Sequence, residues 1–136
     1  MSLFITVNLL NRGQSSSIPQ GDPKRIDLAR LNLRAGQKAF SASVFTSAAG
    51  YLGIGIKCLP QDHWMSEYSL SLDLFSTAAQ TAFCIGDFEM TRTFCDPILE
   101  QKHRPLLDRR CVYDTAVLGD FKGGKIYLDY ALALLR

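Results

Sequence analysis

The sequence predicts an all-α fold in which about six helices stack as antiparallel pairs. Apolar residues recur every three to four positions through most of the 136 residues, which is the spacing of one face of an α-helix. Prolines and glycines divide this pattern into segments of helix length. A Gly-Asp-Phe sequence occurs at 86–88 and again at 119–121, so the two glycines lie 33 residues apart. Together these observations indicate repeated helix–turn–helix units.

The first two predicted helices precede residue 37. Residues 2–11 are largely apolar, and Gly13 can end this helix because glycine readily adopts the left-handed conformation beyond a helix terminus. A loop rich in Ser, Pro and Gly follows at 14–21. Asp22 and Pro23 then predict a new helix, with the aspartate as N-cap and the proline at the first helical position. Gly36 is expected to end this second helix.

Two longer helices are predicted on either side of Pro60, which cannot continue a helix. The first covers 39–59, where Gly53 and Gly55 would let a neighbouring helix approach closely. The second covers 64–85 and carries the most regular apolar stripe of the chain, which begins at Trp64. We expect these two helices to pack antiparallel. The stripe is typical of a buried core face, and a groove for a partner is the less favoured interpretation.

Further helices are predicted after the Gly86-Asp87 turn. The first covers 88–99, and Pro97 should kink or split it because proline lacks a backbone donor. An apolar face at 107–118 predicts another helix. The last covers 121–135 and is weakened by Gly123 and Gly124.

The composition is that of an ordinary globular protein, with 47% hydrophobic and 21% charged residues. Lys and Arg number 15 and Asp and Glu 13, so the net charge of +2 argues against a dedicated nucleic-acid binder. No signal peptide is recognisable, and no apolar stretch reaches the roughly 18 residues of a membrane span. We therefore expect a cytoplasmic protein with reduced thiols. Its four cysteines are Cys58, Cys84, Cys95 and Cys111.

The segment from Gly119 to Lys125 matches the first part of a phosphate-binding loop, G-x-x-x-x-G-K. In such a loop, successive backbone N–H groups surround the phosphates. However, Ile126 occupies the place of the hydroxyl residue that binds magnesium, and only 11 residues follow Lys125. A nucleotide-binding enzyme fragment is therefore the alternative to a non-catalytic module. A strand leading into this loop would favour the enzyme, and a helix–turn–helix would favour the module.

The other sequence motifs that could indicate a catalytic or binding site are incomplete. Residues 53–55, Gly-Ile-Gly, are half of a dinucleotide-binding fingerprint and are more typical of tight helix packing. Cys58 with His63, and Cys95 with His103, lack the paired spacing of zinc ligands. No serine lies in the G-x-S-x-G sequence of a hydrolase. We therefore assign no catalytic, cofactor-binding or metal-binding residue, and we expect no cofactor.

An ordered set of residues resembles one particular family. Residues 31–39 read Leu-Asn-Leu-Arg-Ala-Gly-Gln-Lys-Ala, and Tyr51-Leu52, Leu59-Pro60 and Trp64 follow. This set is similar to the tetratricopeptide-like segment of large signalling proteins that combine a serine/threonine kinase, an ATPase and a histidine kinase. The likeness continues through 68–88 and at 107–108, and it reaches upstream to 7–13. The 33-residue spacing is also close to the tetratricopeptide period of about 34 residues.

The resemblance implies a tetratricopeptide-like solenoid at 22–136, preceded at 1–21 by a helix and loop that end an upstream module. In that family the segment follows an AAA/STAND ATPase and precedes a GAF domain and a histidine kinase. It implies a non-catalytic role in signal transduction, through contacts with neighbouring domains or a protein partner. No nucleic acid, membrane or small-molecule substrate is expected. The family's Walker, H-R-D and D-F-G motifs are absent from this chain, so no activity is carried over.

Overall fold

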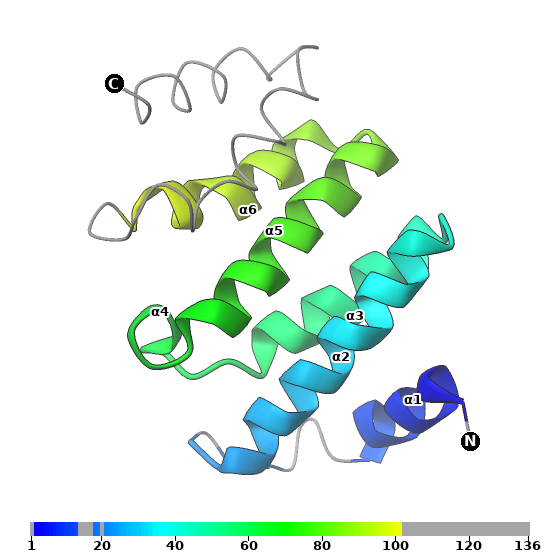
Figure 1. Cartoon of the computed structure of the whole chain (residues 1–136), viewed down its shortest axis with the longest axis vertical. Helices are drawn as coiled ribbons and strands as arrows, with labels where there is room; N and C mark the ends of the chain where they lie inside the picture. The colour runs from blue at the N-terminus through cyan, green and yellow to red at the C-terminus, as the bar shows by residue number, and fades with distance from the viewer. Residues whose placement is uncertain (1, 14–17, 20, 102–136) are drawn as a thin grey trace.

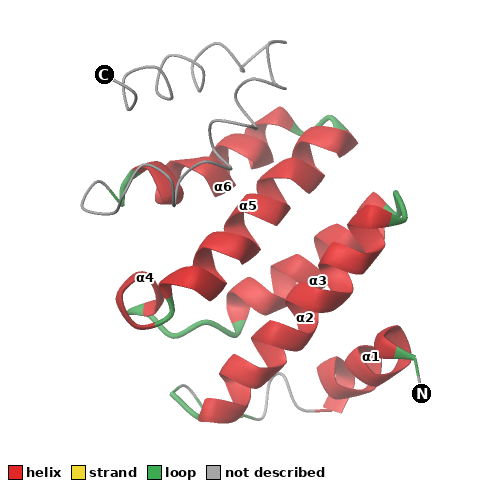
Figure 2. Cartoon of the chain, viewed as in Figure 1, coloured by secondary structure: helices red, strands yellow, loops and turns green. Residues whose placement is uncertain are grey.

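The computed structural model describes residues 2–13, 18–19 and 21–101, and all regular structure in these residues is α-helical (Figures 1 and 2). The predicted all-α class is confirmed for this part of the chain. The segments expected to form helices at 107–118 and 121–135 lie outside it. The helices, in order, are α1 (Leu3–Gly13), α2 (Pro23–Ser41), α3 (Phe45–Lys57), α4 (His63–Ser66), α5 (Tyr68–Ile85) and α6 (Phe88–Leu99).

The helices pack in sequence order around one apolar core. α2 and α3 form an antiparallel hairpin, α5 packs against α3, and α6 packs against α5 (Figure 1). Leu52 of α3 and Leu74 of α5 are fully buried at the centre of this core. No helix of the described residues is long and apolar enough to cross a membrane.

Local signals set three helix boundaries, at the Asp22-Pro23 start and on both sides of the Gly86-Asp87 turn. Asp22 caps α2, since its Oδ1 accepts a hydrogen bond of 2.9 Å from the backbone N–H of Lys24, and Pro23 is the first helical residue. Gly86 ends α5 in the left-handed conformation, with φ of 90°. Asp87 then caps α6 through a 3.1 Å hydrogen bond from the N–H of Met90. The predicted Gly86-Asp87 turn is confirmed.

The expectation that Gly36 ends the second helix is wrong. α2 continues to Ser41, and the chain turns at 42–44, where Ser43 has φ of 61°. Gly36 is buried against α3, and a Cβ at this position would lie 2.7 Å from Cγ and Cδ2 of Leu52. The glycine therefore permits close helix packing and does not interrupt the helix. The single helix expected at 39–59 is also wrong. Because α2 continues past Gly36 to Ser41, residues 39–59 comprise the end of α2, a turn, and α3.

The single helix expected at 64–85 is also divided. Glu67 leaves the helical conformation, with φ of −134°, and separates the short α4 from α5. The half-buried Trp64 ring contacts the rings of Tyr68 and Phe75 at centroid distances of 5.9 and 5.1 Å. The local apolar stripe therefore contributes to the core across the break. Pro97 does not split α6, since the helix continues through it to Leu99.

Polar and aromatic contacts hold α1 against the α2–α3 hairpin. Asn11 and the fully buried Asn32 exchange amide hydrogen bonds of 2.8 and 3.0 Å. The Tyr51 hydroxyl donates to Asn8, and its ring stacks on Phe4 with the centroids 5.6 Å apart. The helix that the resemblance assigns to the end of an upstream module thus contacts the predicted repeat region directly.

Candidate functional site

A cleft of about 440 Å³ opens between the first turns of α2 and the connection from α3 to α5. Its charged lining includes Arg25 and Arg30 from α2, together with Asp62 and Glu67 from the segment around α4. The buried Cys58, just after α3, also lines the cleft. The residues of this cleft are the natural place to look for binding or catalysis.

Arg25 has a structural role on one side of this cleft. Its guanidinium donates 2.9 Å to the carbonyl oxygen of Ile18 and 2.8 Å to that of Lys57. The second contact places a positive charge at the C-terminal end of α3, where helix carbonyls and the helix dipole favour a cation. Arg25 thereby ties the loop before α2 to the end of α3.

The Cys58 thiol is poorly suited to act as a nucleophile. Burial raises its pKa, and the charge of Arg25 only partly opposes this effect. Because the reactive species is the thiolate, a raised pKa keeps the group in its inert, protonated form at neutral pH. Cys58 therefore behaves as a core residue at the edge of the cleft.

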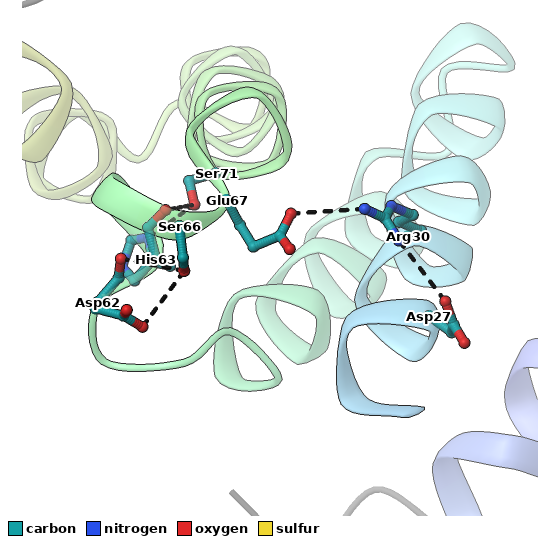
Figure 3. Close-up of polar contacts among 7 residues, drawn as sticks. All are labelled: Asp27, Arg30, Asp62, His63, Ser66, Glu67 and Ser71. Atoms are coloured by element: carbon teal, nitrogen blue, oxygen red, sulfur yellow. Dashed lines mark hydrogen bonds and ion pairs between the residues drawn. The ribbon is translucent and has the colours of Figure 1, made fainter. Parts of the chain in front are cut away.

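Arg30 connects the two sides of the cleft. Its guanidinium lies 3.5 Å from the carboxylate of Glu67 and 3.7 Å from that of Asp27 (Figure 3). The Arg30 and Asp27 side chains are more than half exposed, so these ion pairs contribute little to stability. They orient the α4–α5 junction relative to α2.

His63 and Ser71 form a partly buried polar contact near the cleft. The His63 Nδ1 and Ser71 Oγ atoms lie 2.7 Å apart, and the Ser71 hydroxyl also lies 3.2 Å from the carbonyl oxygen of His63 (Figure 3). Asp62 accepts a hydrogen bond of 3.3 Å from the Ser66 hydroxyl. Ser71 is fully buried, so its hydroxyl is not exposed to solvent. These groups resemble a hydrolytic triad in composition, but they hold α4 against the start of α5.

His63 should make the free energy of unfolding decrease as the pH is lowered below about 6.5. Burial lowers the pKa of His63 in the folded state, and the nearby Asp62 opposes this only in part. The unfolded chain therefore binds the proton more readily, and the free energy of unfolding decreases as the pH falls from 6.5 towards the folded-state pKa. We expect urea denaturation at about pH 7.5 and 5.5 to show this decrease, and His63→Gln to reduce it. His103 is present in both the unmodified chain and His63→Gln, so it does not account for a difference between them. The same pH dependence in the two proteins would contradict the prediction.

The structure places the sequence candidates in separate, mostly structural environments. Gly55 packs closely against α5 and α2, as expected: a Cβ there would lie 2.8 Å from Leu74 Cδ2 and 3.4 Å from the Ala29 carbonyl oxygen. Gly53 has open space around it. No group of three or more potential metal ligands occurs among the described residues. The segment from Gly119 to Lys125 lies outside the residues that the structure describes.

Basic and acidic residues are separated along the chain, although the total charge is close to balanced. Residues 1–61 contain seven basic and two acidic residues, a net charge of +5. Residues 62–101 contain one basic and seven acidic residues, a net charge of −6, and residues 102–136 contain seven basic and four acidic residues, a net charge of +3. The amino-acid sequence already indicates this separation, since no acidic residue occurs from 28 to 61. In the fold, the first set lies on α1–α3 and the second on α4–α6 and the turns beside them.

No protein-family model matches the sequence, and neither a curated protein nor a solved structure shows significant similarity to it.

Proposed function

We propose that this chain is a non-catalytic, tetratricopeptide-like helical module of the cytoplasm. It would act in signal transduction by contacting neighbouring domains or a protein partner, as the resemblance to kinase–ATPase–histidine kinase proteins implies. In that arrangement it couples the ATPase module to the histidine kinase output. The polar groups in and beside the cleft support this proposal, because Arg25, His63 and Ser71 make hydrogen bonds that hold helices and loops together.

The outward face of α1 is the observation that carries the proposal. Ile5 and Leu9 are 53% and 54% exposed, and their i, i+4 spacing places them on the same face of the helix. Val7 of the same helix is fully buried. α1 therefore packs on the α2–α3 hairpin and also presents aliphatic side chains outward. In the family that the sequence resembles, this helix adjoins the ATPase module, which would cover Ile5 and Leu9.

Site-specific photocrosslinking tests this contact. A photoreactive phenylalanine analogue is placed at Ile5 or Leu9 of the full chain in the native host, and crosslinked products are identified by mass spectrometry. We expect products that contain an ATPase or histidine kinase module. The analogue at Val44, which is 48% exposed in the α2–α3 turn, is the matched control. Products identical at all three positions, or products without either module, would contradict the proposal.

The chain should bind neither ATP nor GTP. The expectation follows from Ile126, which lacks the hydroxyl that holds magnesium in a phosphate loop. Isothermal titration calorimetry of the full chain with nucleotide and magnesium should show no saturable heat. Micromolar binding that Lys125→Ala abolishes would instead support the alternative, a nucleotide-binding enzyme fragment.

A further inference from the structure

We propose that copies of this chain associate head to tail, with a cationic ridge on α2 of one copy against an acidic ridge on α6 of the next. The cationic ridge consists of Arg34 and Lys38, and the acidic ridge consists of Asp96 and Glu100. This association is independent of the contact proposed for the outward face of α1.

The two ridges match in spacing. Arg34 and Lys38 are four residues apart on α2, and Asp96 and Glu100 are four residues apart at the end of α6. Each pair therefore lies on one helix face, with its members about 6 Å apart along the axis. Arg34, Lys38 and Glu100 are exposed, and Asp96 is half-buried. Two parallel charge pairs can form between such ridges in a single register.

Neither ridge is neutralised within the described part of the chain. The ion pairs there join Arg30 to Asp27 and to Glu67, and none involves a ridge residue. The Lys38 ammonium lies over the Phe4 ring, 5.4 Å from its centroid, which leaves its charge unpaired by a carboxylate. The ridges also belong to parts of the sequence with opposite net charge, +5 for residues 1–61 and −3 for residues 62–136. Long-range attraction therefore favours the same orientation as the local pairs.

The positions of the ridges favour a head-to-tail contact. α5 lies between α6 and the α2–α3 hairpin, so the helices that carry the two ridges are on opposite sides of it (Figure 1). When two copies associate through two different surfaces, each end of the dimer still has one free surface. Further copies can therefore add to form a chain, or the assembly can close into a ring. We therefore expect a series of species whose mass grows with concentration.

Sedimentation velocity of the full chain tests this association. At about 50 mM salt the weight-average mass should rise with protein concentration, and at about 500 mM salt it should fall to that of the monomer, because salt screens exposed charges. The variants R34E/K38E and D96K/E100K should each weaken self-association more than about tenfold, since like charges then face each other. An equimolar mixture of the two variants should assemble again, because each reversed ridge meets a complementary one.

The variant K24E/K57E is the matched control. It changes the net charge as R34E/K38E does, but both lysines lie at the opposite end of the hairpin, near the start of α2 and the end of α3. It should self-associate like the unmodified chain. Far-UV circular dichroism establishes that every variant is folded.

The proposal would be overturned by a chain that stays monomeric at about 1 mM protein in low salt, or by a mixture of the two variants that stays monomeric. Two further results would also overturn it. One is loss of thermal stability in D96K/E100K with no change in mass, which would assign the acidic ridge to contacts within the chain. The other is binding to phosphatidylserine vesicles that R34E/K38E abolishes, without self-association, which would assign the cationic ridge to a membrane surface.

Discussion

Replacing Leu74 by alanine is expected to lower the free energy of unfolding by about 3–5 kcal/mol. The Leu74 side chain is fully buried and belongs to the core that joins α2, α3 and α5. Its Cδ2 lies so close to α3 that a Cβ at Gly55 would be 2.8 Å away. Since the helices are already in close contact, they cannot move together to fill the space that the leucine leaves. A cavity remains, and its cost adds to the lost hydrophobic burial.

Chemical denaturation of the full chain measures this loss, with Leu72→Ala as the control. Leu72 lies on the same helix but is only partly buried at the edge of the core. Its truncation should cost clearly less, since part of the removed surface already faces water. A loss for Leu74→Ala below about 1 kcal/mol would mean that the core around α5 is not packed as described.

Replacing Gly55 by valine should destabilise the chain by about 2–3 kcal/mol through overpacking. The new side chain would meet Leu74 Cδ2 at 2.8 Å, and the Ala29 carbonyl oxygen and Asn32 Cβ at 3.4 Å. Leu74 is enclosed by the core and the carbonyl oxygen belongs to α2, so the clash must be relieved by moving helices apart. The favourable change in helix propensity on losing a glycine, under about 1 kcal/mol, does not offset this cost.

Gly53→Val is the matched control for Gly55→Val. Gly53 lies two residues earlier on α3, and apart from its chain neighbours and the adjacent backbone of α3 no heavy atom lies within 4 Å of a Cβ built there. Both substitutions change helix propensity equally, so a difference in unfolding free energy reports the packing of α3 on α5. Equal values in urea denaturation would contradict the close approach.

A double mutant makes the same contact measurable as a coupling energy. In Gly55→Ala/Leu74→Ala the new methyl group enters space that the leucine has vacated. We expect the double mutant to be less destabilised than the sum of the single mutants, by about 1–2 kcal/mol. Additive effects would show that Gly55 and Leu74 do not touch.

Several contacts at the candidate site join residues that are far apart in the sequence. Ser71 follows His63 by eight residues, and their contact forms because Glu67 leaves the helical conformation between them. Arg30 reaches Glu67 across 37 positions of sequence, and Arg25 reaches the carbonyl of Lys57 across 32. Spacing along one helix cannot predict such contacts. The segregation of charge between residues 1–61 and 62–101, by contrast, requires only counting.

By itself, the sequence determined the helical class of the described residues and those boundaries that local chemistry enforces. The Asp22–Pro23 start needs only a carboxylate near the first free N–H groups, and the Gly86-Asp87 turn needs only a residue that tolerates positive φ followed by a cap. The tertiary structure decided where the remaining helices begin and end. Gly36 carries the same local signal as Gly86, but it stays within α2 because Leu52 packs where a side chain would otherwise lie. A glycine's freedom permits both outcomes, and the neighbouring helix selects between them through close packing.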